Sequence, residues 1–403
     1  MQRQGDKGLP HNLRLGSRLR GGLAGLLVVA PLLVQSQGAV RAAQLQLTAT
    51  VAPSPFLPAG GSADVMASLR TAGGSAASLG GVSVTLSGSG GGIRLTQPTR
   101  AQRQRGVVAV LKAGAATGRS SVTVTAPGAA PETLPVEVYK SPAQLLSGKG
   151  AWASFSTYSS LGASLILARS AREGVTHLYL ETTGVRFVGQ AQLDSVLQQA
   201  HNLGIAVIAW DYAALKQVPA EIRSARTTVS YTAGLGARVD GLAGDFEENL
   251  SAGAMATFSA AVRQALGRTR AYVGIIYPPQ FGFPTPIATM AHYVDAFAPM
   301  DYWLSAARPY SPAQAAAFVQ RSITELDNTP GEAGVPIEVV SQTQDIENAS
   351  GFGIYNPPPA QVIASAKAGM AAGAIGVSFY DLRTQTQAQI AAIAALQIPS
   401  SIQ

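Results

Sequence analysis

Two carboxylates two residues apart, Asp245 and Glu247, end a short apolar segment that begins at Val239. If this segment is a β-strand, Ala243, Asp245 and Glu247 share one face, because side chains two apart point the same way. Adjacent carboxylates suit general acid and base chemistry, since each raises the proton affinity of the other. At the C-terminal end of a strand in a (β/α)8 barrel, they would lie where that fold places its catalytic residues.

The chain beyond Tyr139 has the order of elements that such a barrel requires. Apolar strands alternate there with segments of helical period, which predicts eight strand–helix units within residues 148–400. The predicted strands are Trp152–Phe155, His177–Leu180, Ile205–Trp210, Val239–Phe246, Tyr272–Tyr277, Val294–Met300, Ile337–Ser341 and Ile375–Tyr380. An open, doubly wound sheet is the main alternative, but it normally has a glycine-rich phosphate turn after its first strand, and residues 154–158 are not one.

Acidic and aromatic side chains gather at the predicted C-terminal ends of these strands, although only 6% of the residues are aromatic. Aromatic faces stack on sugar rings and carboxylates bind hydroxyl groups, so this rim suits a carbohydrate. The candidate substrate-binding residues are Tyr158, Glu181, Trp210, Asp211, Tyr277, Asp301, Trp303, Gln342 and Tyr380. A strand-ending aspartate can instead cap the following helix, which is the second interpretation of Asp211 and Asp381.

Residues 1–42 have the pattern of a secretory signal peptide. An arginine-rich start precedes a short apolar run, and small residues at 42–43 predict a cleavage site. An uncleaved anchor is the alternative; no later segment is apolar and long enough to span a membrane. The pattern predicts a bacterial protein that is secreted or held in the cell envelope, with cell-surface association as a further expectation. Because the chain has no cysteine, disulfides and thiolate chemistry are excluded.

Residues 44–140 form a separate region rich in Ala, Gly, Ser, Thr and Val. Short alternating runs, such as Val82–Leu86 and Ser121–Thr125, are separated by turn residues, which predicts an all-β sandwich. The order of its turn and strand motifs resembles bacterial immunoglobulin-like domains of the invasin type. We therefore expect a multidomain chain in which an immunoglobulin-like sandwich, acting as a spacer or adhesion module, precedes the (β/α)8 barrel.

The segment that begins at Asp240 and Gly241 resembles the D-G-x-D-x-D-x-E motif of family 18 glycoside hydrolases, the chitinase-like barrels. It matches at Asp245 and Glu247 as well, and differs at the middle aspartate, which is Ala243 here. Residues 298–302 (APMDY) resemble a second family motif on the sixth strand, although Trp303 replaces its final aspartate. The strand-eight tryptophan of the family is also replaced, by residues 379–380 (FY).

The resemblance implies a glycosidase that needs no enzyme nucleophile. Glu247 would be the general acid, Asp245 would hold the 2-acetamido group of the substrate, and Tyr302 would hydrogen-bond the same group.

Three other interpretations of the carboxylates remain. Glu247 could work with a carboxylate from another strand, Glu181, Asp211 or Asp301, as an acid/nucleophile or acid/base pair. Because Ala243 removes part of the family motif, the barrel could also be a non-catalytic glycan-binding or surface adhesion protein. Finally, the two acids could be structural and bind backbone amides.

Several other classes of function are poorly supported by the sequence. The four histidines, His11, His177, His201 and His292, do not lie at predicted strand C-termini, so we expect neither a metal site nor a Ser–His–Asp hydrolase. No cofactor is expected, because no phosphate-binding loop is present. The net charge of +7 is partly due to the predicted leader, and without a basic run interleaved with aromatics we expect no nucleic acid partner.

Overall fold

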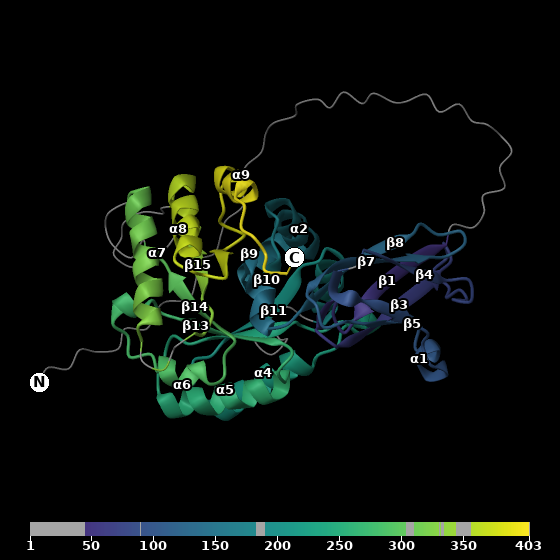
Figure 1. The fold of residues 1–403 in the computed structure, drawn as a ribbon, viewed down its shortest axis with the longest axis horizontal. Helices are drawn as coiled ribbons and strands as arrows, with labels where there is room; N and C mark the ends of the chain where they lie inside the picture. Colours follow the sequence, from purple (N-terminus) through teal and green to yellow (C-terminus); the bar gives the residue numbers. More distant parts are fainter. Residues whose placement is uncertain are drawn as a thin grey trace, which may run out of the picture. The chain divides into compact units, whose positions relative to one another are not determined.

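The computed structural model describes residues 45–88, 90–182, 190–303, 310–329, 331, 334–343 and 356–402. The predicted leader, residues 1–42, lies outside the described residues. Two regions follow one another along the described chain: a pair of β-sheets and then a barrel of alternating strands and helices (Figure 1).

The first region consists of two four-stranded sheets, which we call the two-sheet domain. One sheet has the order β1 (Gln46–Ala52), β3 (Ser62–Arg70), β6 (Val107–Lys112) and β5 (Arg94–Thr96). The other has the order β2 (Phe56–Pro58), β8 (Glu132–Tyr139), β7 (Gly118–Thr125) and β4 (Ser83–Ser87). Alternate residues of β3 and β7 are buried, as the period of two predicts, and side chains from both sheets share one apolar core. A short helix, α1 (Arg100–Gln104), precedes β6.

The second region is a closed parallel barrel, which confirms the predicted barrel and excludes the open-sheet alternative. Its strands are β9 (Gly148–Ala153), β10 (His177–Glu181), β11 (Ala206–Tyr212), β12 (Gly241–Asp245), β13 (Ala271–Ile276), β14 (Ala296–Asp301), β15 (Glu338–Gln342) and β16 (Gly376–Tyr380). The helices that follow them in turn are α2 (Phe155–Glu173), α3 (Gln190–Asn202), α4 (Val218–Ser230), α5 (Ala252–Leu266), α6 (Ile287–Ala291), α7 (Pro312–Asp327), α8 (Pro359–Ala371) and α9 (Gln387–Ala395). No helix within the described ranges is long and apolar enough to cross a membrane.

Each barrel strand has an inner and an outer face, although both faces are buried. In β11, Ile208 and Trp210 belong to the interior cluster of apolar side chains, whereas Val207 and Ala209 pack against the helices. This is the usual environment of parallel strands, and it makes their sequence nearly continuously apolar. The parity of a residue within its strand therefore decides whether it faces the interior or the helices.

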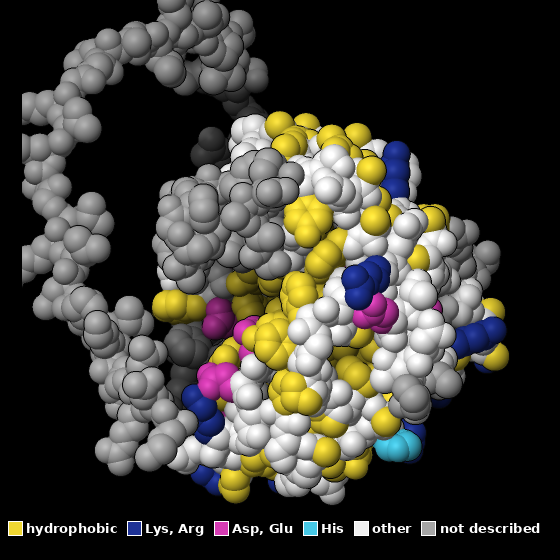
Figure 2. All heavy atoms as spheres, turned by 90° about the vertical axis from the view of Figure 1, so that its left-hand side faces the viewer, with side chains coloured by type: hydrophobic (Ala, Val, Ile, Leu, Met, Phe, Trp, Pro, Cys, Tyr) yellow, Lys and Arg dark blue, Asp and Glu magenta, His cyan; other side chains and the backbone are white. Residues whose placement is uncertain are grey.

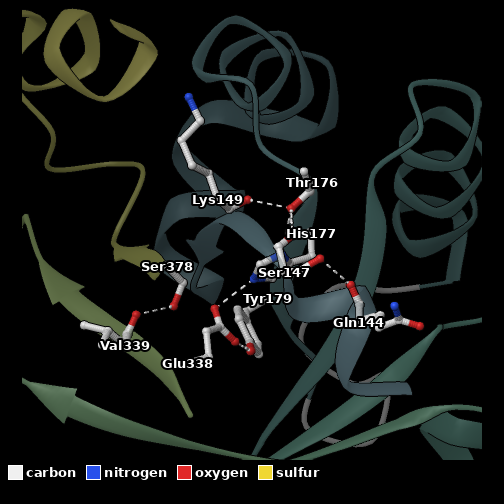
Figure 3. A network of polar contacts seen from close by, with 9 residues as sticks. All are labelled: Gln144, Ser147, Lys149, Thr176, His177, Tyr179, Glu338, Val339 and Ser378. Carbon is white, nitrogen blue, oxygen red and sulfur yellow. Dashed lines mark hydrogen bonds and ion pairs between the residues drawn. The ribbon is translucent and has the colours of Figure 1, made fainter. Parts of the chain in front are cut away.

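A polar network lies in the N-terminal half of the barrel (Figure 3). The imidazole of His177 lies 2.8 Å from one carboxylate oxygen of Glu338, and the hydroxyl of Tyr179 donates to the other. All three side chains are fully buried. Gly150 makes room for them, because a Cβ at this position would lie 2.3 Å from Nε2 of His177. Trp152 stacks on Tyr179, with ring centroids 4.0 Å apart. It thereby connects the polar network to the C-terminal half of the interior.

Asp240, the first acid of the motif, joins the barrel to the two-sheet domain. Its carboxylate accepts hydrogen bonds from the hydroxyl of Ser54, from the backbone N–H of Val207 at 2.7 Å and from the imidazole of His201 at 2.9 Å. A second link lies nearby, where the Tyr139 hydroxyl donates to the backbone carbonyl of Thr269. Asp240 is thus occupied by structural contacts at the start of β12.

Candidate active site

A cavity of about 230 Å³ lies at the C-terminal ends of the barrel strands. Its lining residues come from six different strands or the residues just after them: Trp152, Trp210, Asp245, Glu247, Ile275, Met300, Tyr302 and Tyr380. The barrel therefore brings the two carboxylates of β12 together with aromatic side chains that are far apart in sequence. On one face of the molecule, acidic side chains are grouped beside exposed hydrophobic ones (Figure 2).

Asp245 is the buried member of the carboxylate pair, with 3% of its surface exposed. The indole N–H of Trp210 donates to Oδ2 at 3.0 Å, while Oδ1 is buried without a hydrogen-bond partner among the described residues. Burial, and then the neighbouring charge of Glu247, raise the pKa of Asp245 well above its usual value, and the hydrogen bond from Trp210 opposes them. Asp245 thus combines a high proton affinity with a position beside the cavity and next to Glu247.

Glu247 lies two residues further on, just beyond the end of β12, and is partly exposed. Its Oε2 accepts a hydrogen bond of 3.1 Å from the hydroxyl of Tyr277. Burial raises the pKa of Glu247, although the hydrogen bond from Tyr277 opposes this. Because two neighbouring carboxylates in a buried site do not readily ionise together, the pair retains a proton at a higher pH than isolated acids would.

Ala243 is buried in the barrel interior and lies directly opposite Trp210 in the register of β11 and β12. Both side chains belong to the interior cluster above the polar network. The small methyl group of Ala243 therefore faces the same part of the interior as the Trp210 indole. Position 243 therefore offers no carboxyl group to Asp245, and the indole N–H of Trp210 contacts Asp245 instead.

Tyr302 and Tyr380 form an aromatic wall of the cavity. Their rings stack with centroids 5.7 Å apart, and Trp152 packs edge-on against Tyr380 at 5.9 Å. The charges of Asp245 and Glu247 are among the causes, after burial, that raise the pKa of both tyrosines. Both phenols therefore stay protonated and able to donate hydrogen bonds next to the acids.

Glu181 ends β10 and is close enough for its charge to raise the pKa of Asp245. Its Oε2 accepts a hydrogen bond of 2.6 Å from the backbone N–H of Phe155 at the start of α2. Gln342 ends β15 on the interior parity of Val340 and pairs in register with Tyr380. These two predicted residues thus lie near the cavity without lining it.

Four other predicted residues lie in the helical layer. Asp211 and Asp301 have the outward parity of their strands, and the Ser322 hydroxyl of α7 lies beside Asp301. Burial, followed by the charge of Glu221, raises the pKa of Asp211 to about 7.

The other two are aromatic. Trp303 is fully buried and donates its indole N–H to Gln361 of α8, while Tyr158 packs in the core between α2 and α3. The structure brings none of these four into the cavity.

Several residues at the site were missed by sequence reasoning. Trp152 lines the cavity, yet in the sequence it stands at the start of its predicted strand rather than at the C-terminal end. At the rim, Tyr212 donates to Glu248, which is also paired with Lys216. Phe283 stacks on Tyr277 with centroids 4.2 Å apart. The sequence feature that could have pointed to Phe283 is the proline-rich segment with two phenylalanines after the fifth barrel strand.

Neither a model of a known protein family nor a curated protein matches this chain. Among solved structures, it is similar to the spore cortex-lytic enzyme SleL of Bacillus cereus (12% identity, 66% of this chain and 78% of that chain, TM-score 0.45). It is also similar to a family GH18 chitinase of Cycas revoluta (13%, 62% and 97%, 0.42) and to a β-glucuronidase of Ruminococcus gnavus (10%, 87% and 67%, 0.46). Because these TM-scores are below 0.5, the assignment of the barrel rests on its own strand topology.

Proposed function

We propose that this protein is a glycoside hydrolase that acts on a polysaccharide or cell-wall glycan. The observation that carries the proposal is the pair formed by Asp245 and Glu247 at the mouth of the barrel, beside a cavity walled by aromatic side chains. A proton held on this pair can be delivered to a glycosidic oxygen, which is the step that every such hydrolysis requires. The aromatic walls suit the apolar faces of a sugar ring.

In this proposal Glu247 is the general acid. It is the more exposed carboxylate of the pair, and Tyr277 fixes its orientation through Oε2. Asp245 assists from below, with Oδ1 available to accept an N–H or O–H group of the substrate. Tyr302 and Tyr380 supply phenolic donors from the aromatic lining of the cavity.

We propose that Trp210 orients Asp245 in place of the middle aspartate, which is Ala243 in this chain. Because its indole N–H hydrogen-bonds Asp245 from opposite Ala243, Asp245 keeps a fixed orientation without a carboxylate neighbour on its own strand. The hydrogen bond also favours the ionised form of Asp245, which leaves more of the shared proton on Glu247. Trp210 is therefore proposed as a positioning residue.

In the alternative mechanism Glu247 works with a second carboxylate, and the positions of the other acids leave one candidate partner. Asp211 and Asp301 face the helices, so among the partners considered only Glu181 is near enough to influence the pair. Glu181 already accepts a backbone N–H, as a positioned nucleophile or base could. Substrate assistance and a Glu181–Glu247 pair are thus the two candidate chemistries.

The proposal includes export of the chain through its predicted leader, with the two-sheet domain as an immunoglobulin-like spacer. N-terminal sequencing of protein collected from a bacterial host tests the leader: a mature N-terminus near Ala43 is expected, and an intact residue 1 in exported protein contradicts it.

The function itself is tested by incubating wild-type protein with chitin-type, β-glucan and galactosaminoglycan polysaccharides and measuring new reducing ends. Turnover of at least one class is expected, with Glu247→Gln binding the same glycan without cleaving it. Binding without turnover by the wild type would instead indicate the second candidate function, a non-catalytic glycan-binding protein, which Ala243 favours. Neither binding nor turnover would contradict both.

A further inference from the structure

We propose that Phe283 and Phe281 form a carbohydrate-stacking surface that binds an extended glycan where it leaves the cavity past Glu247 and Tyr277. This inference rests on the proposed function, because it takes the cavity beside Glu247 as the site that holds one sugar ring of the same glycan. The occupant is a neutral, β-linked pyranose chain, whose axial C–H groups form an apolar face on each ring.

The exposed apolar side chains are concentrated at the barrel mouth. Six large apolar residues of the described chain are exposed, and four of them lie at or after the C-terminal ends of barrel strands: Phe155, Tyr212, Phe281 and Phe283. Phe283 is 49% exposed and Phe281 is 37% exposed. Exposed aromatic side chains that gather around a cleft are typical of a binding surface.

A continuous path of contacts joins these phenylalanines to the acid. The Tyr277 hydroxyl hydrogen-bonds Glu247, and the Tyr277 ring stacks on Phe283 with an interplanar angle of 28°. Phe281 lies edge-on to Phe283, with ring centroids 6.5 Å apart. A chain that leaves the cavity past Glu247 on this side therefore meets Tyr277 first and Phe283 next.

The loop that carries Phe281 and Phe283 is held in place before any ligand binds. Residues 277–286 contain four prolines, which restrict the backbone. Gln280 donates to the backbone carbonyl of Phe318 in α7 at 3.2 Å, and the Phe281 ring packs against that of Phe318 at 5.7 Å. Because the rings are already ordered, binding costs little conformational entropy.

The size of the cavity explains why a second binding surface is needed. At about 230 Å³ it is smaller than the roughly 300–1,000 Å³ of sites for drug-sized ligands, so it suits about one sugar ring. The rest of a polysaccharide must lie across the rim. The loop 277–286 has no charged residue, and the charges that act on its Tyr277 are those of three acids, Glu247, Asp245 and Glu248, so a neutral glycan fits better than an anionic one.

The experiment measures how affinity depends on chain length. Glu247→Gln, which should not cleave its ligand, is titrated calorimetrically with β-1,4-linked oligomers of two to six N-acetylglucosamine units, and with the matching glucose series. Affinity is expected to rise with length in one series. Adding Phe283→Ala should weaken binding of the longer oligomers about 5- to 10-fold, whereas Phe283→Tyr, which keeps the ring, should retain it. Leu165→Ala, at another exposed apolar residue, is the control and should leave the affinity for every oligomer unchanged.

The outcomes separate this inference from the proposed function. Equal affinities with and without Phe283→Ala, or no binding of either series, would overturn the stacking surface; hydrolysis by the wild type that depends on Glu247 would still support the function. Conversely, binding that depends on length and on Phe283, in a wild-type protein that cleaves nothing, would support the surface and overturn the enzymatic function.

Discussion

At the scale of single residues, the proposed role of Trp210 rests on a contact across the barrel rather than along the strand. Ala243 lies opposite Trp210 in the strand register, and the Trp210 indole N–H donates a hydrogen bond of 3.0 Å to one oxygen of Asp245. Two consequences can be measured, one on the pH profile and one on stability.

Removing the Trp210 donor should change how tightly the carboxylate pair holds its proton. The hydrogen bond lowers the pKa of Asp245, so Trp210→Phe should raise it, and the alkaline limb of kcat/KM should move up by about one pH unit. The measurement is a pH–rate profile on the polysaccharide that the wild type cleaves. Trp303→Phe, which removes an indole N–H outside the cavity, should leave the limb in place; an unchanged limb in Trp210→Phe would contradict the positioning role.

Replacing Asp245 with a neutral amide should stabilise the protein while inactivating it. Burial raises the folded-state pKa of Asp245 above its unfolded value, so the folded protein binds this proton more tightly. Its contribution to stability is full below the unfolded pKa of about 4 and is lost as pH rises through the folded pKa. Asp245→Asn should therefore melt about 2–4 °C above the wild type at pH 8, with a smaller difference at pH 4. Lower stability than the wild type at pH 8 would refute this.

At the scale of elements, the barrel closes where β16 pairs with β9, and side-chain contacts just after β16 join it to the start of α2. Asp381 is buried and accepts hydrogen bonds from the hydroxyls of Ser154 and Thr157 at 3.1 and 2.7 Å, and from two backbone N–H groups of its own turn. It thus fixes the first turn of α2 beside Tyr380, a wall residue of the cavity.

Asp381→Ala should lower the free energy of unfolding by about 2–4 kcal/mol, because it leaves several buried donors without an acceptor. Chemical denaturation followed by circular dichroism measures the loss. Asp327→Ala, at the exposed end of α7, is the matched control and should stay within about 0.5 kcal/mol of the wild type. Equal losses in both variants would show that the hydrogen bonds of Asp381 do not contribute to the free energy of unfolding.

The alternation of apolar strands and helical segments was enough to predict the barrel and the place of Asp245 and Glu247. Whether each of the other strand-end side chains points into the barrel or toward the helices was harder to predict, because strands buried on both faces lack a polar–apolar pattern. Trp210 and Asp211 are adjacent and look equally suited to a sugar, yet the first faces the cavity and the second faces the helices. Trp152 could not be recognised because its role depends on stacking with Tyr179 across the barrel.

At the scale of the whole molecule, side chains of the two-sheet domain complete the core of the barrel. Phe56 and Tyr139 belong to the same apolar cluster as Leu145 and Ile208, and Asp240 accepts a hydrogen bond from Ser54. The first acid of the motif thus connects the two regions instead of serving the cavity.

The described chain should therefore unfold as one cooperative unit. Differential scanning calorimetry is expected to give a single transition whose calorimetric and van't Hoff enthalpies agree. Ser54→Ala should lower its midpoint by a few degrees, since Asp240 loses a donor, without splitting the peak. Two separate transitions in the wild type would show that the contacts around Asp240 do not couple the regions.

The central claim is that Glu247 delivers the proton that breaks a glycosidic bond. It is tested most directly by comparing reducing-end release by the wild type, Glu247→Gln and Glu248→Gln on a polysaccharide that the wild type cleaves. Glu248 is the adjacent, exposed acid, paired with Lys216, so it controls for loss of charge at the rim. We predict that Glu247→Gln lowers kcat at least about 100-fold with binding retained, whereas Glu248→Gln stays within a few-fold of the wild type. Equal rates in wild type and Glu247→Gln would contradict the claim.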